Sequence, residues 1–136
     1  YLTAHTRPFG LEEAFPDIAS GDTVDMEAML EADPDVLLGL GGMHPETDIP
    51  AIRERLRTHP VGRQLSAVRN ERVYAQGARF QGPILNLFQL EMTAKQLYPD
   101  EFGAWPTYTE GPYPELPADE QLFYRDRVAA VIRGDL

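Results

Sequence analysis

The sequence predicts an α/β layered domain. Short strand patterns alternate along the chain with segments whose apolar residues recur at helical spacing, which is typical of layered α/β folds. Residues 35–40 form a mainly apolar run, as expected of a parallel strand that is covered on both faces. A long amphipathic segment begins at Gly82-Pro83, directly after a strand pattern and a polar loop. The 136 residues are enough for one domain with a core and too few for two.

The amino-terminal part predicts helices, a strand and a loop in turn. A short helix is expected at Leu11–Phe15 and another at Asp25–Ala32, which Pro34 ends because the residue before a proline avoids the helical region. The strand at Asp35–Leu40 follows, and a glycine-containing loop at residues 41–45 leaves its carboxyl end. In open α/β sheets such strand ends are where ligands bind.

A further helix is predicted after Asp48, which is a good N-cap and is followed by Pro50 in the first helical turn. Ile52 and Leu56 give this helix one apolar stripe, which we expect to face the core. The charged residues are expected on the outer side of the helix: Arg53, Glu54, Arg55 and Arg57.

Two short strand patterns come next, at Leu65–Val68 and Arg72–Ala75. The residues between them, Arg69-Asn70-Glu71, are predicted to turn the chain. Asn70 is suited to that turn because asparagine tolerates the left-handed conformation that such turns need.

The main helix is predicted at Pro83–Leu97, with proline in its first turn. Glu91 and Lys95 are spaced for an ion pair one helical turn apart. The side chains expected to lie inward are Ile84, Leu87, Phe88 and Ala94.

The carboxyl-terminal part predicts a loop and a last helix. Pro99–Pro117 is rich in proline, glycine and tyrosine, and Trp105 favours an ordered crossing loop over a linker. Ala118–Ile132 is expected to form the last helix, which Gly134 ends.

Composition narrows the classes of partner. A formal net charge of −10 argues against a nucleic acid or an anionic membrane. Lys95 is the only lysine, and an acidic, lysine-poor surface fits a halophile as well as a GC-rich genome. The absence of cysteine excludes disulfides and thiolate sites. No signal peptide or bilayer-spanning run is present, and Tyr1 reads like the continuation of a strand or loop, so we interpret the sequence as an excised fragment.

No catalytic motif stands out, so we interpret the chain as a binder rather than an enzyme. His44 lies in the loop after a strand and can serve as a ligand or a proton acceptor, but no partner residues stand at metal-site spacing. Arg79 and Phe80 can hold an anionic or aromatic ligand by charge and stacking. A small α/β enzyme that uses His44 is the alternative from another class.

Three segments, in this order, resemble the carboxyl-terminal lobe of ABC-transporter substrate-binding proteins of the iron-siderophore, haem and cobalamin class. Val24–Leu38 is similar to the family's helix-to-strand unit E-x-L-L-x-A-x-P-D-V-I. Ala67–Tyr74 is similar to A-V-K-N-G-R-V-Y, with Glu71 where the family often has glycine. Phe80–Phe102 ends like the family's A-x-x-L-Y-P-E-x-F. The resemblance covers about residues 11–103.

The resemblance implies a three-layer α/β/α lobe with a mainly parallel central sheet, which is one half of a bilobal class III substrate-binding protein. Residues 1–136 would form this single carboxyl-terminal lobe, with a core at 11–103 and an extension of loop and helix at 104–136. The amino-terminal lobe would be absent. The whole protein would be the extracytoplasmic binding component of an ABC importer, at the cell surface or in the periplasm and anchored to the membrane.

In that family the ligand lies between the lobes, against loops at the strand ends. The ligand-binding positions implied by the resemblance are Thr6, Arg7, Met43, His44, Arg79, Phe80 and Gln81. Glu27 matches the glutamate that docks on arginines of the permease. The carried ligand would be an iron(III) chelate, either a siderophore or haem, and cobalamin is the alternative within the class. No resident cofactor or metal is expected.

Overall fold

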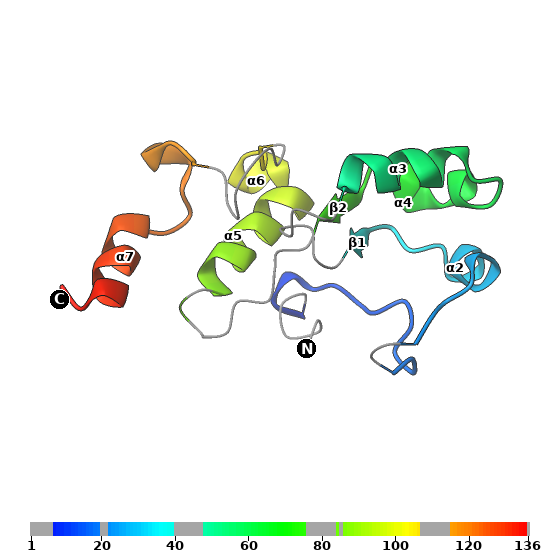
Figure 1. The fold of residues 1–136 in the computed structure, drawn as a ribbon, viewed down its shortest axis with the longest axis horizontal. Helices are drawn as coiled ribbons and strands as arrows, with labels where there is room; N and C mark the ends of the chain where they lie inside the picture. Colours follow the sequence, from blue (N-terminus) through cyan, green and yellow to red (C-terminus); the bar gives the residue numbers. More distant parts are fainter. Residues whose placement is uncertain are drawn as a thin grey trace. The chain divides into compact units, whose positions relative to one another are not determined.

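The computed structural model describes residues 7–19, 22–39, 48–75, 84, 86–106 and 115–135. The chain divides into two compact units, residues 1–76 and 77–136, and we describe each unit by itself (Figure 1). The first unit contains η1 (Arg7–Phe9), α2 (Met26–Ala32), β1 (Leu37–Gly39), α3 (Ile49–Thr58), η2 (Gly62–Gln64), α4 (Ser66–Arg69) and β2 (Val73–Ala75). The second contains α5 (Asn86–Leu97), α6 (Pro99–Phe102), η3 (Ala118–Glu120) and α7 (Arg125–Arg133). A single lobe over residues 1–136 stays a prediction.

The sheet of the described residues consists of two parallel strands, β1 and β2. Leu37 pairs with Val73 and Gly39 with Ala75, and the Leu37 amide donates a hydrogen bond of 3.0 Å to the Arg72 carbonyl. The connection between the strands contains α3 and α4, since parallel strands need a long crossover. The predicted α/β class is confirmed, and so are the strands predicted around these residues.

The core of the first unit is an apolar cluster that joins its strands to three of its helices, α2, α3 and α4. Its buried members are Leu65, Val68 and Val73, and the partly buried side chains packed against them are Met26, Met29, Leu30, Leu37 and Leu56. Fully burying one such side chain contributes about 1.5–3 kcal/mol. This packing holds α2 in place, because a helix of seven residues is too short to be stable by its own propensity.

An aspartate caps each end of α2, although only the bounds of this helix were predicted from the sequence. The Asp25 carboxylate accepts a hydrogen bond of 2.8 Å from the Ala28 amide. At the other end Asp33 adopts a left-handed conformation with φ of 37°, and its amide donates to the Met29 carbonyl at 3.0 Å. The helix therefore ends at Ala32, just before Pro34, and the predicted helix is confirmed.

The helix predicted after Asp48 is confirmed, but the side chains on its inner face differ from those expected. Asp48 caps α3 by accepting a hydrogen bond of 2.9 Å from the Ala51 amide. Ile49 is buried, whereas Ile52 is 36% exposed. Arg53, expected to point outward, is partly buried because its Nε donates to the Val73 carbonyl at 2.7 Å. An apolar stem can lie against the core while the guanidinium reaches a polar atom, which hydropathy alone does not predict.

The strand predicted at Leu65–Val68 is wrong, because this segment starts a helix. Leu65 is the N-cap residue of α4, and its own side chain makes no capping hydrogen bond. Asp33 caps the helix instead, since its Oδ1 accepts from the Ser66 amide at 2.7 Å. A short apolar run has no clear period, so the sequence alone does not distinguish a strand from a buried helical turn.

The helix predicted at Leu11–Phe15 is also wrong. The helical turn of this region is η1, which precedes it, and Gly10 ends that turn with φ of 72°. Residues 11–15 contain no helix. Five residues cannot offset the free energy of nucleating a helix without packing, and Pro16 follows directly.

The turn before β2 is confirmed, but a different residue carries the left-handed conformation. Asn70 has φ of −93°, whereas Glu71 has φ of 58°. Glycine adopts this conformation without steric strain, which explains why the resembled family pattern often has glycine at this position. Glu71 therefore stands in a conformation that glycine adopts more easily.

The main helix of the second unit, α5, is confirmed within the described residues, but two of its expected inward positions are not buried. Ala94 is buried and Phe88 is half-buried, whereas Ile84 and Leu87 are 40% and 37% exposed. Ile84 and Leu87 line an apolar groove of about 300 Å³ together with residues of α7.

The expected ion pair between Glu91 and Lys95 is wrong, because each side chain has another partner. The Lys95 ammonium is buried and donates to the Phe102 carbonyl at 2.6 Å, at the end of α6. Glu91 Oε2 instead accepts from Arg125 Nη2 at 2.6 Å, and Glu91 Oε1 accepts from the Leu122 amide at 2.7 Å. Partners between seven and 34 residues away thus replace one pair a helical turn apart.

The last helix is shorter than predicted. Residues 118–120 form η3, and α7 begins only at Arg125. Its predicted end is confirmed, since Gly134 has φ of 77° and its amide donates to the Val131 carbonyl at 3.1 Å. Residues 107–114 of the expected crossing loop and the expected helix start at Pro83 lie outside the described residues.

Candidate functional site

The residues expected to bind ligand divide into described and undescribed positions. Arg7 opens η1 and is exposed. The positions that lie outside the described residues are Thr6, Met43, His44, Arg79, Phe80 and Gln81. For the positions from Met43 to Gln81, the structure shows the strands that precede them along the chain, β1 and β2.

The carboxyl ends of the two strands lie at one edge of the sheet. Gly39 and Ala75 are the last residues of β1 and β2, and they are paired in register. The chain leads from Gly39 to His44 and from Ala75 to Arg79. Both candidate segments therefore begin at neighbouring positions on the edge where open α/β sheets bind ligands. A side chain at Gly39 would lie 3.3 Å from Ile49 Cδ1, so the glycine lets α3 pack closely on this strand.

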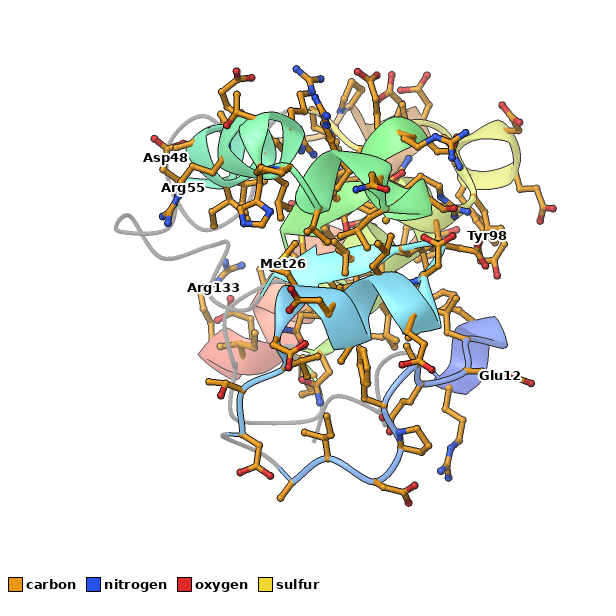
Figure 2. The ribbon with its side chains drawn as sticks, turned by 90° about the vertical axis from the view of Figure 1, so that its right-hand side faces the viewer. Glu12, Met26, Asp48, Arg55, Tyr98 and Arg133 are labelled. Carbon is orange, nitrogen blue, oxygen red and sulfur yellow. The ribbon has the colours of Figure 1, made fainter. Side chains whose placement is uncertain are left out.

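Glu27 lies on the solvent side of α2. Met26, Met29 and Leu30 pack against the core, whereas Glu27 and Glu31 are exposed. The two carboxylates are one helical turn apart, a spacing at which like charges destabilise a helix slightly. Figure 2 shows α2 with Met26 labelled at its start. The exposed face of α2 is thus acidic and suited to a basic partner.

Asp33 connects two segments whose link the sequence did not predict. Its Oδ1 accepts from the Ser66 amide and its Oδ2 from the Ser66 hydroxyl, both at 2.7 Å. These hydrogen bonds, the backbone one first, hold the pKa of Asp33 below its usual value of 3.8, and the charge of Arg69 adds to the shift. The link joins a residue within the family-like segment 24–38 to the residue directly before the family-like segment 67–74. In the sequence, the link from Asp33 to Ser66 is indicated only by an aspartate directly before a proline.

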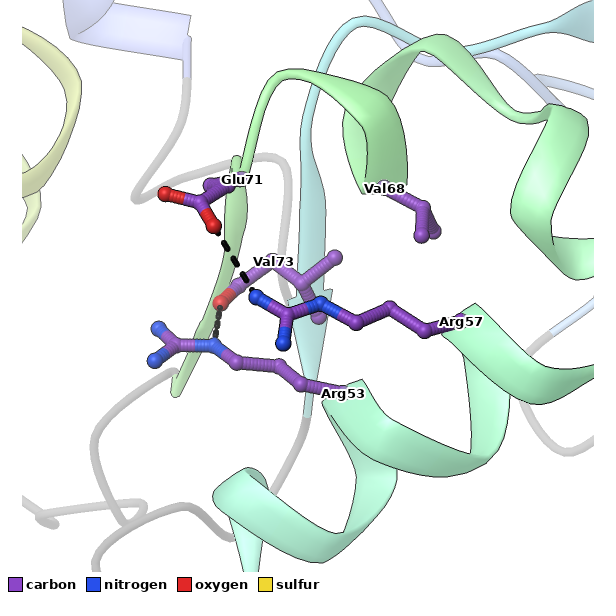
Figure 3. Close-up of a pocket in the computed structure, with 5 residues that line it drawn as sticks. All are labelled: Arg53, Arg57, Val68, Glu71 and Val73. Carbon is purple, nitrogen blue, oxygen red and sulfur yellow. Dashed lines mark hydrogen bonds and ion pairs between the residues drawn. The ribbon is translucent and has the colours of Figure 1, made fainter.

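The first unit contains a recess near the amino end of β2 (Figure 3). It has a volume of about 170 Å³ and is lined by Arg53, Arg57, Val68, Glu71 and Val73. The side chains of Arg53 and Arg57 extend from α3 in the same direction, toward β2. We call it the arginine pocket. Both arginines were expected on the outer side of the helix, and their spacing of four residues places them on one face.

Metal sites and membrane-spanning helices are two features that can be assessed for the residues that the structure describes. Within the described ranges, no group of three or more histidine, cysteine or acidic side chains is arranged to hold a metal ion. Among the helices that the structure describes, none combines the length and apolar character needed to span a bilayer.

The fold and the strand-end geometry define an α/β binding domain, and comparison with known proteins identifies its family. A family model with the description periplasmic binding protein matches residues 2–79, which is more than half of the chain. The chain therefore belongs to the periplasmic binding protein family, which has a class III α/β fold. No curated protein and no solved structure matches the chain.

Family membership establishes the general function. The chain is a substrate-binding protein of the ABC importer type, with a small-molecule ligand, an ABC permease as partner and an extracytoplasmic location. The family is one of binding proteins and not of enzymes. The iron-siderophore, haem and cobalamin class that the sequence resembles fits this family.

Proposed function

We propose that this chain acts as the second lobe of a receptor that binds an iron(III) chelate between two lobes and delivers it to an ABC permease. The observation that carries the proposal is the pairing of Gly39 with Ala75, which places the ends of both parallel strands at one edge. Anchoring of the whole receptor to the membrane is part of the same proposal.

Chain length supports one shared ligand surface. Met43 and His44 follow Gly39 by four and five residues, and Gln81 follows Ala75 by six. An extended chain spans about 3.3–3.6 Å per residue, so a stretch of four to six residues reaches at most about 20 Å from a strand end. Thr6 and Arg7 complete the proposed set from the preceding segment.

The chemistry of the candidate residues favours an anionic chelate. Arg79 carries a permanent positive charge, and the N–H donors of its guanidinium have a fixed planar arrangement. Both properties suit the carboxylate or phenolate oxygens of a siderophore or the propionates of haem. Phe80 supplies a flat apolar face for an aromatic ligand group. Cobalamin also offers a flat ring, and we keep it as the alternative that the binding experiment decides.

The binding experiment titrates a receptor containing both lobes with a ferric catecholate, a ferric hydroxamate, haem and cyanocobalamin. We expect an iron(III) chelate to bind, and Arg79→Gln to weaken it at least about tenfold, because the lost hydrogen bonds are charge-assisted. Arg133→Gln is the control, since Arg133 pairs with Asp135 at 2.8 Å at the end of α7. Binding of cyanocobalamin alone contradicts the iron assignment, and tight binding by residues 1–136 alone contradicts a ligand site shared by two lobes.

We further propose that Glu27 docks on an arginine of the permease. Its exposure on a face of α2 that carries no core residue supports this role. In the whole receptor, Glu27→Arg should leave ligand affinity unchanged and reduce uptake about tenfold or more, because it replaces an attraction with a repulsion. Glu31→Arg, one turn further along the same exposed face, is the matched control. Normal uptake by the Glu27→Arg receptor contradicts the docking role.

A further inference from the structure

We propose that the arginine pocket binds a small oxyanion, that is, a carboxylate or phosphate group. The pocket lies near the amino end of β2, whereas the ligand edge proposed above lies at the carboxyl end of the same strand. The two proposals therefore concern different places in the first unit, and each can fail without the other.

Arg53 is oriented before any ligand arrives. Its Nε donates to the Val73 carbonyl at 2.7 Å, and this bond fixes the plane of the guanidinium. Within the described residues, the structure shows no hydrogen bond or ion pair to the terminal nitrogens of Arg53. A guanidinium fixed in this way loses less side-chain entropy when it binds an anion, and its paired donors match the two oxygens of a carboxylate or phosphate.

Arg57 already holds a carboxylate in this pocket. Glu71 Oε1 lies 2.9 Å from Arg57 Nη2, and Glu54 Oε2 lies 3.8 Å from Arg57 Nη1. The Glu71 side chain is 76% exposed, so solvent surrounds most of it and an incoming anion can displace it. Glu71 thus acts as an internal competitor for the site that we propose.

The backbone of Glu71 is strained, which also favours a role beyond packing. With φ of 58°, a glutamate at this position is less stable than a glycine would be. Strained residues occur preferentially at binding sites. Val68 and Val73 form the apolar part of the lining.

The test titrates the 136-residue chain with sodium phosphate and, separately, with sodium acetate at constant ionic strength, and follows the arginine side-chain N–H signals by NMR. We expect a saturable shift with at least one of the two probes. Glu71→Gln should tighten binding about threefold to tenfold, because it removes the competing charge. Arg57→Gln should weaken it at least about tenfold. Arg55→Gln is the control, since Arg55 lies on the same helix and is exposed, but does not line the pocket.

Each outcome has a definite meaning. Stronger binding of phosphate assigns the pocket to a tetrahedral dianion, and stronger binding of acetate assigns it to a carboxylate group. Shifts that rise linearly without saturation, and equally in the chain with Arg57→Gln, overturn the proposal. If the chain with Arg57→Gln fails to fold, an unchanged affinity in the chain with Glu71→Gln overturns the proposal by itself.

Discussion

At the scale of single residues, Asp33 has the clearest consequence for stability. It accepts both hydrogen bonds of Ser66 at 2.7 Å and so caps α4 from outside that helix. Asp33→Asn keeps the shape of the side chain but removes the negative charge that favours a helix N-terminus. We expect this variant to unfold at lower urea concentration than the unchanged chain at pH 7. Asp35→Asn, at an exposed position two residues away, is the control and should have little effect.

The pH dependence of this effect follows from the lowered pKa of Asp33. Because the folded-state pKa lies below the usual value of 3.8, the charged form stabilises the folded state at any pH above that value. The contribution is lost as the pH falls below 3.8 and through the folded-state pKa. The difference in urea midpoint between the chain and its Asp33→Asn variant should therefore shrink in this acidic range. A difference that stays constant down to the acid transition contradicts the assignment.

Glu71 allows a test of backbone strain that is separate from its charge. Glu71→Gly and Glu71→Ala both remove the carboxylate that pairs with Arg57, but only glycine accepts a φ of 58° without strain. Urea unfolding should show the glycine variant to be more stable than the alanine variant by roughly 0.5–1 kcal/mol, after the larger entropy of the unfolded glycine chain is included. Equal stability of the two variants means that the turn relaxes.

At the scale of elements, the contacts of Arg125 explain how α7 belongs to the second unit. Arg125 Nη2 lies 2.6 Å from Glu91 Oε2, and the side chains of Arg125 and Glu91 are 15% and 0% exposed. The guanidinium carbon also lies 5.4 Å from the Phe88 ring centre and 6.0 Å from that of Phe123, and the two rings pack edge to face. The predicted extension at residues 104–136 is thus attached to α5 through a buried charge.

Removing one partner of this pair should be strongly destabilising. Arg125→Met leaves the Glu91 carboxylate buried without its cation, and such changes cost about 3–5 kcal/mol. We expect faster proteolysis within residues 115–135 and a lower melting temperature. The double variant Glu91→Met with Arg125→Met removes both charges and should be less destabilised than Arg125→Met alone. If the double variant loses at least as much stability as the single one, the charge pair is not the main link.

The elements predicted correctly have local causes, and two of the errors come from tertiary contacts. The cap Asp48 lies beside the helix that it begins, so the sequence alone indicates it. The helix at Leu65–Val68 depends on a cap from Asp33, more than thirty residues away, which no local pattern shows. Likewise, Glu91 was assigned a neighbour one turn away because its partner 34 residues later was not predictable from spacing.

At the scale of the whole molecule, the family was predictable because three motifs occur in the right order, and the family match over residues 2–79 confirms it. The edge proposed to bind ligand was predicted from one topological rule, which is that parallel strands end at the same edge of a sheet. The pairing of β1 with β2 supports this prediction. The arginine pocket was missed because Arg53 makes its decisive bond to a backbone carbonyl, and a periodic pattern of side chains contains no information on such a bond.

The net charge of −10 gives the last prediction, which concerns the chain as a whole. Repulsion among exposed carboxylates opposes folding at low ionic strength, and salt screens it because the Debye length falls from about 10 Å at 0.1 M to about 3 Å at 1 M. We expect the melting temperature to rise with potassium chloride over this range, as a halophilic origin, the alternative to a GC-rich genome, also requires.

Screening can be distinguished from other effects of salt by the shape of the curve of melting temperature against salt concentration, and by a variant. Stabilisation by screening levels off at high salt, whereas stabilisation by exclusion of salt from the protein surface continues to grow. Changing the exposed acids Glu12, Asp17 and Glu101 to lysine lowers the net negative charge by six, so the salt dependence should become weaker. If the melting temperature of the unchanged chain stays flat or falls with potassium chloride, its acidic surface does not limit its stability. That result removes the physical basis for interpreting the acidic surface as halophilic.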